Sequence, residues 1–423
     1  MSIVVGENSV ETRTHIPIPV IADSIPTERQ DVVRSKLARR LVGGVLSLAV
    51  VSGVIDVTPV LHKDASMISD LAVSDLSSKP SIPQNEAANI VNNYSLGDNL
   101  FKGNSIGWIA SAWFSSQALN AEYLTSLDNG VSRRYSRHFK ASLNAINSSY
   151  IGEVPSRKLG NHHPTGKMLR CYEQGPTNFH VSSDAPLIDD NNWMGLIDFR
   201  EYLRTKTPLL LKDTEAVFNL AHSQWDPNGG GIYWQYQLDN NVSHGRALVS
   251  NAPVVILGVE LYKATGKESY LKFAEKVYSW VQHNLYDPGT GLYNDHIGRN
   301  NVIDYAKYTY GQAVMFEAMS KLNEVNPSKY PLSNAISLAE RSMAYFGQNN
   351  GYGNPAFDSI YDQGLMDLAY RYHNASFTNK VISTVRETNM KSPANPKSLL
   401  NVAGKAAIQA LVKLPQNKYN QLF

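Results

Sequence analysis

Apolar side chains recur at three- and four-residue intervals from Phe101 onward, in segments separated by clusters of Gly, Pro, Asn and Asp. This spacing places the apolar side chains on one face of an α-helix, and the clusters are typical of the links between helices. Runs with the alternating pattern of a strand are rare. We therefore expect helices at residues 105–127, 133–147, 190–203, 209–224, 252–265, 268–284, 310–323, 332–346, 357–372, 379–388 and 396–412.

The links between these segments predict how the helices are arranged. A link as short as Thr265-Gly266-Lys267 forces the helices on either side to run antiparallel as neighbours. A solenoid that is open at both ends would carry a fixed sequence period, and no such period is present beyond the loose pairing of helices. The pattern favours an all-α fold in which helix pairs close into a toroid.

The amino-terminal part of the chain has a different pattern. Basic residues at Arg34, Lys36, Arg39 and Arg40 precede an uninterrupted uncharged run that starts at Leu41. A basic flank before about 15 apolar residues is typical of a signal segment, and a tilted helix of this length can also serve as a membrane anchor. A small-x-small cleavage site is missing, which favours an uncleaved anchor.

These features divide the chain into four parts. We expect a cytoplasmic tail without fixed structure at residues 1–40, a signal-anchor at 41–57, a Ser-, Pro- and Asn-rich stalk at 58–98 and a catalytic domain at 99–423. The membrane would be contacted through the segment from Leu41 to Val57, with the basic side in the cytoplasm. The catalytic part would then be exported, either attached to the cell surface or secreted.

Composition narrows the possible partners and cofactors. The chain has 39 Lys and Arg against 37 Asp and Glu, so it carries no electrostatic footprint for a nucleic acid. Aromatic residues make up 10% of the chain, which suits stacking on sugar rings and equally an aromatic core. The single cysteine, Cys171, excludes a disulfide within the chain and a cysteine zinc cluster. The histidines His162, His163 and His180 lack metal-ligand spacing, so we expect no metal and no cofactor.

Candidate chemistry centres on two adjacent carboxyl groups, Asp189 and Asp190, where a loop enters a predicted helix. Residues four apart share a helix face, so Trp193 and Met194 would lie beneath the two acids as an aromatic and apolar floor, with both acids open at the helix mouth. Such a floor raises carboxyl pKa values, and two like charges a few ångströms apart resist simultaneous ionisation. One acid would keep a proton to donate while the other stays ionised to attack, as in a retaining glycosidase.

A structural role is the alternative for this pair. Asp is a preferred N-cap, and a second Asp in the first turn favours the helix dipole. A magnesium-diphosphate site of the DDxxD type is disfavoured, because Trp193 occupies the fifth position.

A succession of motifs resembles glycoside hydrolase family 76. The motifs are Asp189-Asp190-Asn191-Asn192-Trp193, Trp225-Asp226, Gly229-Gly230-Gly231-Ile232-Tyr233-Trp234, Ser250-Asn251-Ala252-Pro253, Leu261-Tyr262-Lys263-Ala264-Thr265-Gly266 and Tyr308-Thr309-Tyr310-Gly311-Gln312. The resemblance implies an (α/α)6 barrel and retaining, endo-acting hydrolysis of α-1,6-mannan. This chain departs from the family where Gly311 and Ala313 replace the usual Asn and Gly.

Carried over by position, the resemblance assigns roles to individual residues. Asp189 would be the nucleophile and Asp190 the acid/base. The implied substrate-binding residues are Trp193, Tyr233, Trp234, Asn251, Tyr310 and Gln312. Two other functions remain open at this point: a transglycosylase on the same scaffold, and a surface module that binds glycans without cleaving them.

Overall fold

The computed structural model describes residues 86–103, 109–127, 132–157, 164–176, 185–236, 245–298, 300–393 and 396–422. The predicted tail and signal-anchor lie outside the described residues, as do His162, His163 and His180. Each of the predicted helices is present. They are α3 (Ala112–Ser126), α4 (Ser132–Ser149), α5 (Ile188–Thr205), α6 (Pro208–Ser223), α7 (Leu248–Thr265), α8 (Glu268–Asn284), α9 (Thr309–Val325), α10 (Leu332–Gln348), α11 (Pro355–Tyr372), α12 (Ala375–Lys391) and α13 (Leu399–Lys413).

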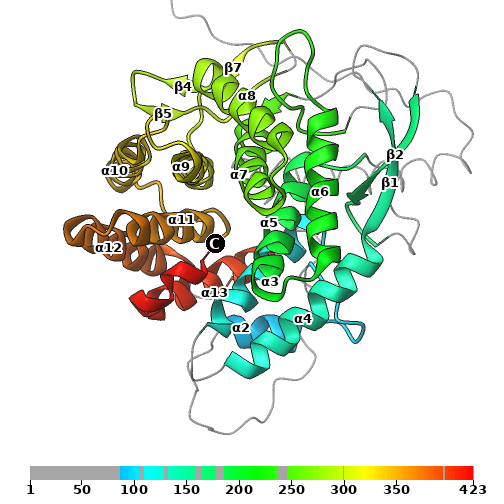
Figure 1. Cartoon of the computed structure of the whole chain (residues 1–423). Helices are drawn as coiled ribbons and strands as arrows, with labels where there is room; N and C mark the ends of the chain where they lie inside the picture. The colour runs from blue at the N-terminus through cyan, green and yellow to red at the C-terminus, as the bar shows by residue number, and fades with distance from the viewer. Residues whose placement is uncertain are drawn as a thin grey trace, which may run out of the picture. The chain divides into compact units, whose positions relative to one another are not determined.

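Six of these helices form a closed inner ring. In the order α3, α5, α7, α9, α11 and α13, each packs against the next, and α13 packs back against α3 (Figure 1). The intervening helices α4, α6, α8, α10 and α12 lie outside, each against the inner helix that precedes it in the chain. The predicted closed toroid of helix pairs is therefore confirmed.

Short left-handed links set the direction of the helices. Gly266 ends α7 with φ 72°, and its N–H donates to Tyr262 O over 2.8 Å. Lys206 and His373 end α5 and α11 in the same left-handed conformation. This termination leaves one further residue before the next helix and turns the chain back on itself. All inner helices consequently run in the same direction, and their first turns gather at one end of the ring, here named the first-turn rim.

Three amide side chains hold the loops of the first-turn rim in place. In the first turns of α5, α7 and α9, an amide oxygen accepts the backbone N–H of a residue 19 positions earlier, and the amide nitrogen donates to the carbonyl oxygen of that residue. The pairs are Tyr172 with Asn191, Ile232 with Asn251, and Tyr293 with Gln312. Each loop is thus fixed to the helix that follows it.

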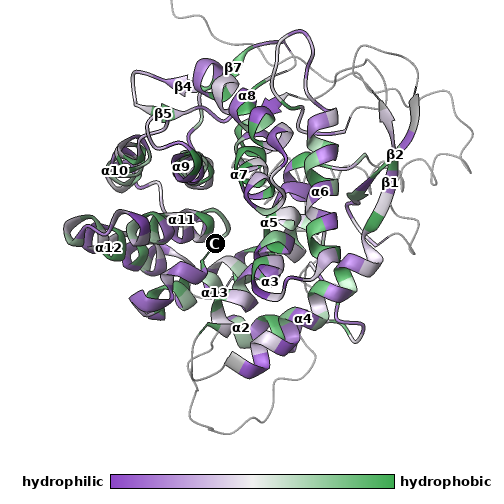
Figure 2. Cartoon of the chain, viewed as in Figure 1, coloured by the Kyte–Doolittle hydropathy of each residue, from purple (hydrophilic) through white to green (hydrophobic). Residues whose placement is uncertain are grey.

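Burial distinguishes the inner helices from the outer ones. Helix α7 is buried continuously from Leu248 to Leu261. Outer helices such as α10 and α12 bury one face and expose polar residues on the other, as Figure 2 shows by their purple edges. The outer helices were recognisable because they are amphipathic, whereas the inner helices are buried on most sides and include polar residues, as in α5 and α11.

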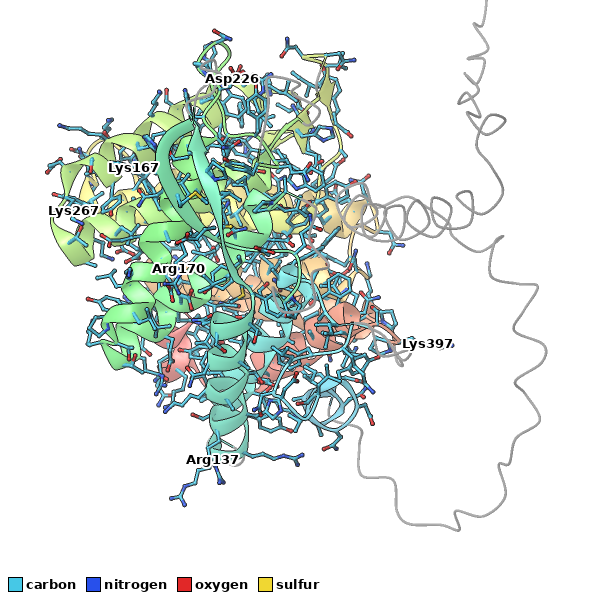
Figure 3. The ribbon with its side chains drawn as sticks, turned by 90° about the vertical axis from the view of Figure 1, so that its right-hand side faces the viewer. Arg137, Lys167, Arg170, Asp226, Lys267 and Lys397 are labelled. Carbon is cyan, nitrogen blue, oxygen red and sulfur yellow. The ribbon has the colours of Figure 1, made fainter. Side chains whose placement is uncertain are left out.

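A hairpin was not predicted. Strands β1 (Ile151–Arg157) and β2 (Pro164–Tyr172) pair antiparallel, with Ile151 opposite Tyr172. Arg170 of β2, which Figure 3 labels, forms an ion pair with Asp213 of α6 at 3.0 Å. The pair attaches the hairpin to the outer layer. The remaining described strands, β3 (Arg246–Ala247), β4 (Tyr286–Asp287), β5 (Leu292–Tyr293), β6 (His296–Ile297) and β7 (Ile303–Asp304), have two residues each.

The predicted stalk boundary at residue 98 is wrong. Helix α2 (Glu86–Asn89) and the π-helical turn η2 (Ile90–Tyr94) pack against α13 as part of the helical fold. The Tyr94 hydroxyl donates to Lys397 O over 2.7 Å. Within the described residues, no helix is long and apolar enough to span a bilayer, and the segment 41–57 lies outside this search.

Candidate active site

The first-turn rim brings together aromatic rings from three inner helices. Tyr310 of α9 lies 4.4 Å, between ring centroids, from Phe357 of α11, which stacks at 6.4 Å on Trp113 of α3. Asp189 and Asp190 belong to the first turn of α5 at the same end. The Trp113 backbone N–H donates to the Asp190 carboxyl, and Tyr310 lies close enough to Asp189 for the two to interact electrostatically.

Neither acid is the N-cap of its helix. That position belongs to Leu187, whose backbone is extended and whose side chain makes no cap. Both aspartates lie in the first turn, where the Asp189 carboxyl accepts the backbone N–H groups of Asp189 and Asp190. We expected both carboxyls to stand open at the rim. Instead Asp189 and Asp190 are only 7% and 4% exposed, and Trp234 and Trp113 lie against their carboxyls. The predicted open position is therefore wrong, and the pair occupies a water-poor environment.

Burial alters the acidity of Asp189. Its pKa is raised to about 6, mainly by burial and to a smaller extent by the nearby negative charge of Asp295. Hydrogen bonds from the Trp234 indole and from the backbone N–H groups of Asp189 and Asp190 act in the opposite direction. These donors favour the ionised form, so Asp189 is the better candidate for a carboxylate.

Asp190 differs from its neighbour in the donors it receives. Burial raises its pKa well above the ordinary value, and the charge of Asp189 raises it again. The Trp113 N–H is the one group that lowers it. Because the two carboxyls titrate as a pair, the first proton lost leaves Asp189 charged and the remaining proton on Asp190. The arrangement can supply one nucleophile and one proton donor.

Asp295 is a site residue that the sequence did not reveal. It lies in the loop before β6, its side chain is buried, and its carboxyl accepts hydrogen bonds from Tyr310 and from His296 Nδ1, the latter over 2.8 Å. Its charge reaches Asp189. The residue belongs to Tyr293-Asn294-Asp295-His296, between two predicted helices, and no spacing within that stretch marks it as functional.

The same loop contains a group of residues with metal-ligand chemistry. Among the described residues, donor atoms of Asp295, His296 and Asp304 lie within 4.8 Å of one another. The hydrogen bond from His296 to Asp295 accounts for this proximity. We therefore assign no ion to the group.

The aromatic candidates occupy different positions. Trp193 lines a cavity of about 40 Å³ inside the ring, together with Asn120, Arg200 and Gln363. Trp234 is half-buried, and its indole binds Asp189 directly. Burial, followed by the charge of Asp226, raises the pKa of Tyr233 to about 12. The Tyr233 hydroxyl donates a hydrogen bond to Asp226. The structure thus brings Trp234 and Tyr310 to the acids and places Trp193 deeper in the ring.

The Gly229–Gly231 segment forms a tight turn. Gly230 and Gly231 have φ angles of 70° and 81°, and a Cβ on Gly231 would lie 2.5 Å from the Trp280 ring. Glycine is needed there for both the backbone angle and the close contact. The turn leads directly into Tyr233 and Trp234.

Two predicted binding residues have structural functions. Asn251 donates to Ile232 O and Ala247 O and accepts from Ile232 N, and it is fully buried. Gln312 is fully buried and bound to both backbone groups of Tyr293. Because these amides already have their partners, we assign neither residue to sugar binding.

A ring of paired helices with two buried, unequal carboxyl groups at one end defines the class of a helical-barrel glycoside hydrolase. The family profile described as Glycosyl hydrolase family 76 matches residues 171–413. The chain belongs to glycosyl hydrolase family 76.

Curated yeast proteins are similar over part of the chain. The mannan endo-1,6-alpha-mannosidase DFG5 of Saccharomyces cerevisiae is 36% identical over 217 residues, which is 44% of this chain and 45% of that protein. The mannan endo-1,6-alpha-mannosidase DCW1 of Candida glabrata is 35% identical over 149 residues, or 34% and 33% of the two chains. The alignments therefore span about a third to a half of these relatives.

Solved structures of the family share the fold. A variant of the α-1,6-mannanase GH76A of Salegentibacter sp. HEL1_6 in complex with α-1,6-mannotriose has a TM-score of 0.62 at 18% identity, over 78% of this chain and 97% of that one. The α-mannanase BT2949 of Bacteroides thetaiotaomicron has a TM-score of 0.64 at 17% identity, over 79% and 94%. At this identity the likeness establishes the helical barrel.

Proposed function

We propose that the protein hydrolyses α-1,6-mannan, or a closely related α-mannoside glycan, with retention of anomeric configuration. The observation that carries the proposal is the unequal pair at the first-turn rim, where three donors favour the charged form of Asp189 and one donor, the Trp113 N–H, favours that of Asp190. The curated relatives are named mannan endo-1,6-alpha-mannosidases, which supports the substrate. The Salegentibacter variant is described as inactive and has two consecutive aspartates replaced by asparagine, which supports the pair.

The two acids would act in two steps. Asp190 donates its proton to the glycosidic oxygen as the bond from that oxygen to the anomeric carbon breaks, and Asp189 forms an ester with the anomeric carbon. Asp190, now ionised, takes a proton from water, whose oxygen displaces Asp189 from the same face on which the leaving group departed. Burial supports this cycle because it keeps a carboxyl protonated near neutral pH.

Transglycosylation is the second candidate on this scaffold. A sugar hydroxyl would replace water in the second step, with the same two acids in the same roles. A module that only binds glycans does not require a buried carboxylate with donors that favour its charge. The donors around Asp189 therefore favour catalysis over a non-catalytic glycan-binding role.

The test is the release of reducing sugar from α-1,6-mannan by the wild type, Asp189→Asn and Asp190→Asn. We expect each substitution to lower kcat by about 10³-fold or more, since a residue that forms or breaks bonds is removed. Equal release by all three proteins would exclude the pair. NMR of the first-formed product should show the α-anomer, and a β-anomer would contradict retention. Added mannose acceptors would be extended if transglycosylation dominates.

We also propose that the catalytic domain acts outside the cell, attached through residues 41–57. The support comes from the sequence, in which a basic flank is followed by an apolar run. The measurement is extraction of membranes from cells that express the chain. Retention in the pellet after alkaline carbonate washing supports an anchor, whereas release of a shortened chain into the medium indicates a cleaved signal.

A further inference from the structure

One aromatic side chain near the acids is directed into solvent. Tyr305 is 67% exposed, the most exposed tyrosine in the described part of the chain. Val302, three residues earlier, is 59% exposed. A single exposed ring is common on protein surfaces. Tyr305 is singled out by its fixed backbone and by its position next to the loop that carries Asp295.

The backbone that carries Tyr305 is held from both sides. Lys307 donates from Nζ to Tyr305 O over 2.9 Å, and the same ammonium group forms an ion pair with Asp287 at 3.1 Å. The side chain of Lys307 is itself almost fully buried. On the other side, the Ala306 N–H donates to Asp304 Oδ1 over 2.9 Å. The ring therefore stands on a preorganised turn, which lowers the entropy lost on binding.

This turn adjoins the site. The Asp295 N–H donates to Asp304 O over 3.2 Å, one residue before Tyr305. Asp295 in turn interacts with Asp189, and both share Tyr310 as a neighbour. Tyr305 therefore follows directly after a residue that is bonded to the loop of Asp295, which in turn interacts with Asp189.

We propose that Tyr305 is an outer sugar-binding platform, on which a pyranose ring of the glycan stacks at a distance from the bond that is cleaved. A tyrosine ring offers an apolar face to the C–H face of a sugar and a hydroxyl to its rim. The proposal rests on the proposed function and adds to it that the preferred substrate is a chain, long enough to reach from the acids to Tyr305.

The test is a chain-length series. The rates of Tyr305→Ala, Tyr305→Trp and the wild type are measured on α-1,6-mannooligosaccharides of increasing length. Tyr305→Ala should raise KM about three- to tenfold for the long chains, the size of one aromatic contact, while kcat and the rate on the shortest cleaved oligosaccharide stay unchanged. Tyr305→Trp should retain or improve the affinity. Tyr370→Ala, which removes a 39% exposed ring from the last turn of α11 at the other end of the ring, is the matched control.

A second readout does not depend on turnover. Calorimetric titration of long oligosaccharides into Asp190→Asn, with and without Tyr305→Ala, should give the same three- to tenfold change in Kd. The inference is overturned if Tyr305→Ala equals the wild type at every length, or if it weakens short and long chains equally. If the wild type cleaves mannan and Tyr305 has no effect, only this inference fails. If the wild type neither binds nor cleaves mannan, the proposed function fails and this inference with it.

Discussion

The two ends of the inner ring both bury charged groups, but they pair them differently. At the end where the inner helices finish, Lys321 forms an ion pair with Glu260 at 2.7 Å, and Arg371 with Asp367 at 2.6 Å. At the first-turn rim, Asp189, Asp190 and Asp295 lie close together, and no lysine or arginine contributes to the pKa shift of any of them. The ion pairs hold neighbouring helices together, whereas the rim carboxyls, which lack a lysine or arginine partner, have raised pKa values.

Buried carboxyls elsewhere in the described residues make the contrast more specific. Asp198 and Asp362 also have raised pKa values from burial, but each accepts a hydrogen bond from a hydroxyl group, Tyr172 and Thr388 respectively. Glu317 is raised by burial and by Asp367, with Lys321, Arg371 and Arg200 acting against it. Asp362 is also raised by a neighbouring acid, Asp358, but the Thr388 hydroxyl donates to it. At Asp190 the charge of the adjacent Asp189 is opposed by one backbone N–H alone, and this is the feature that separates the rim pair from the other buried acids.

Breaking the paired end should give the largest loss of stability. Lys321→Met leaves Glu260 buried beside Lys263 alone, and removing one partner of a buried pair costs about 3 kcal/mol or more. We expect urea unfolding to show this loss at pH 7, with kcat per folded molecule unchanged. Lys380→Met, which breaks an exposed pair with Glu340 at 2.8 Å, is the control and should cost less than about 1 kcal/mol. Equal losses in the two variants would contradict the role of burial.

Replacing an acid at the rim should increase the stability of the fold. The folded pKa of Asp190 is above its unfolded value, so the folded state holds more protons and stability falls as pH rises from about 4. Asp190→Asn has no such penalty and should be more stable than the wild type by about 1–3 kcal/mol at pH 7. The gain should disappear below about pH 4, where the wild-type carboxyl is protonated in both states. A variant less stable than the wild type at pH 7 would show that the carboxylate form is the one held in the fold.

Replacing the third acid, Asp295, should have a smaller effect, on the pH dependence of activity. Asp295→Asn removes a negative charge that raises the pKa of Asp189. The acid limb of the kcat/KM profile, which reports ionisation of the nucleophile, should therefore move to lower pH. Asp304→Asn, at a carboxyl that is half exposed and has no such effect on Asp189, is the control. An unmoved limb in Asp295→Asn would remove Asp295 from the electrostatics of the site.

The helices could be predicted from the sequence because hydrophobic spacing and turn residues within each segment determine them. Amphipathic spacing marks α10 and α12, and Thr265-Gly266-Lys267 marks a left-handed turn, so helix pairing followed from neighbouring residues. The hairpin β1–β2 was missed because its strands include Gly152, Pro155 and Gly166, which weaken a strand pattern. The start of the folded unit was misplaced because η2 is one short turn, stabilised by contacts with α13 some 300 residues away.

The candidate site was predictable only in part. Adjacent acids are visible in the sequence, and their position in the first turn of α5 is confirmed. Asp295 is about 100 residues from Asp189 in the sequence and reaches it through the loop that pairs with Arg246–Ala247, a contact that no local pattern encodes. The amides of Asn251 and Gln312 were interpreted as substrate-binding groups. In the structure they are hydrogen-bonded to the backbone of the residue 19 positions earlier, which a sequence motif does not reveal.

The central claim is that the rim carboxyls share their protons unequally. It is tested most directly by NMR titration of the wild-type chain carrying ¹³C-labelled aspartate, with the two signals assigned from Asp189→Asn and Asp190→Asn. The account predicts that Asp189 titrates near pH 6 and that Asp190 titrates at a higher pH. Titration of both carboxyls near pH 4, as for ordinary exposed aspartates, would contradict it.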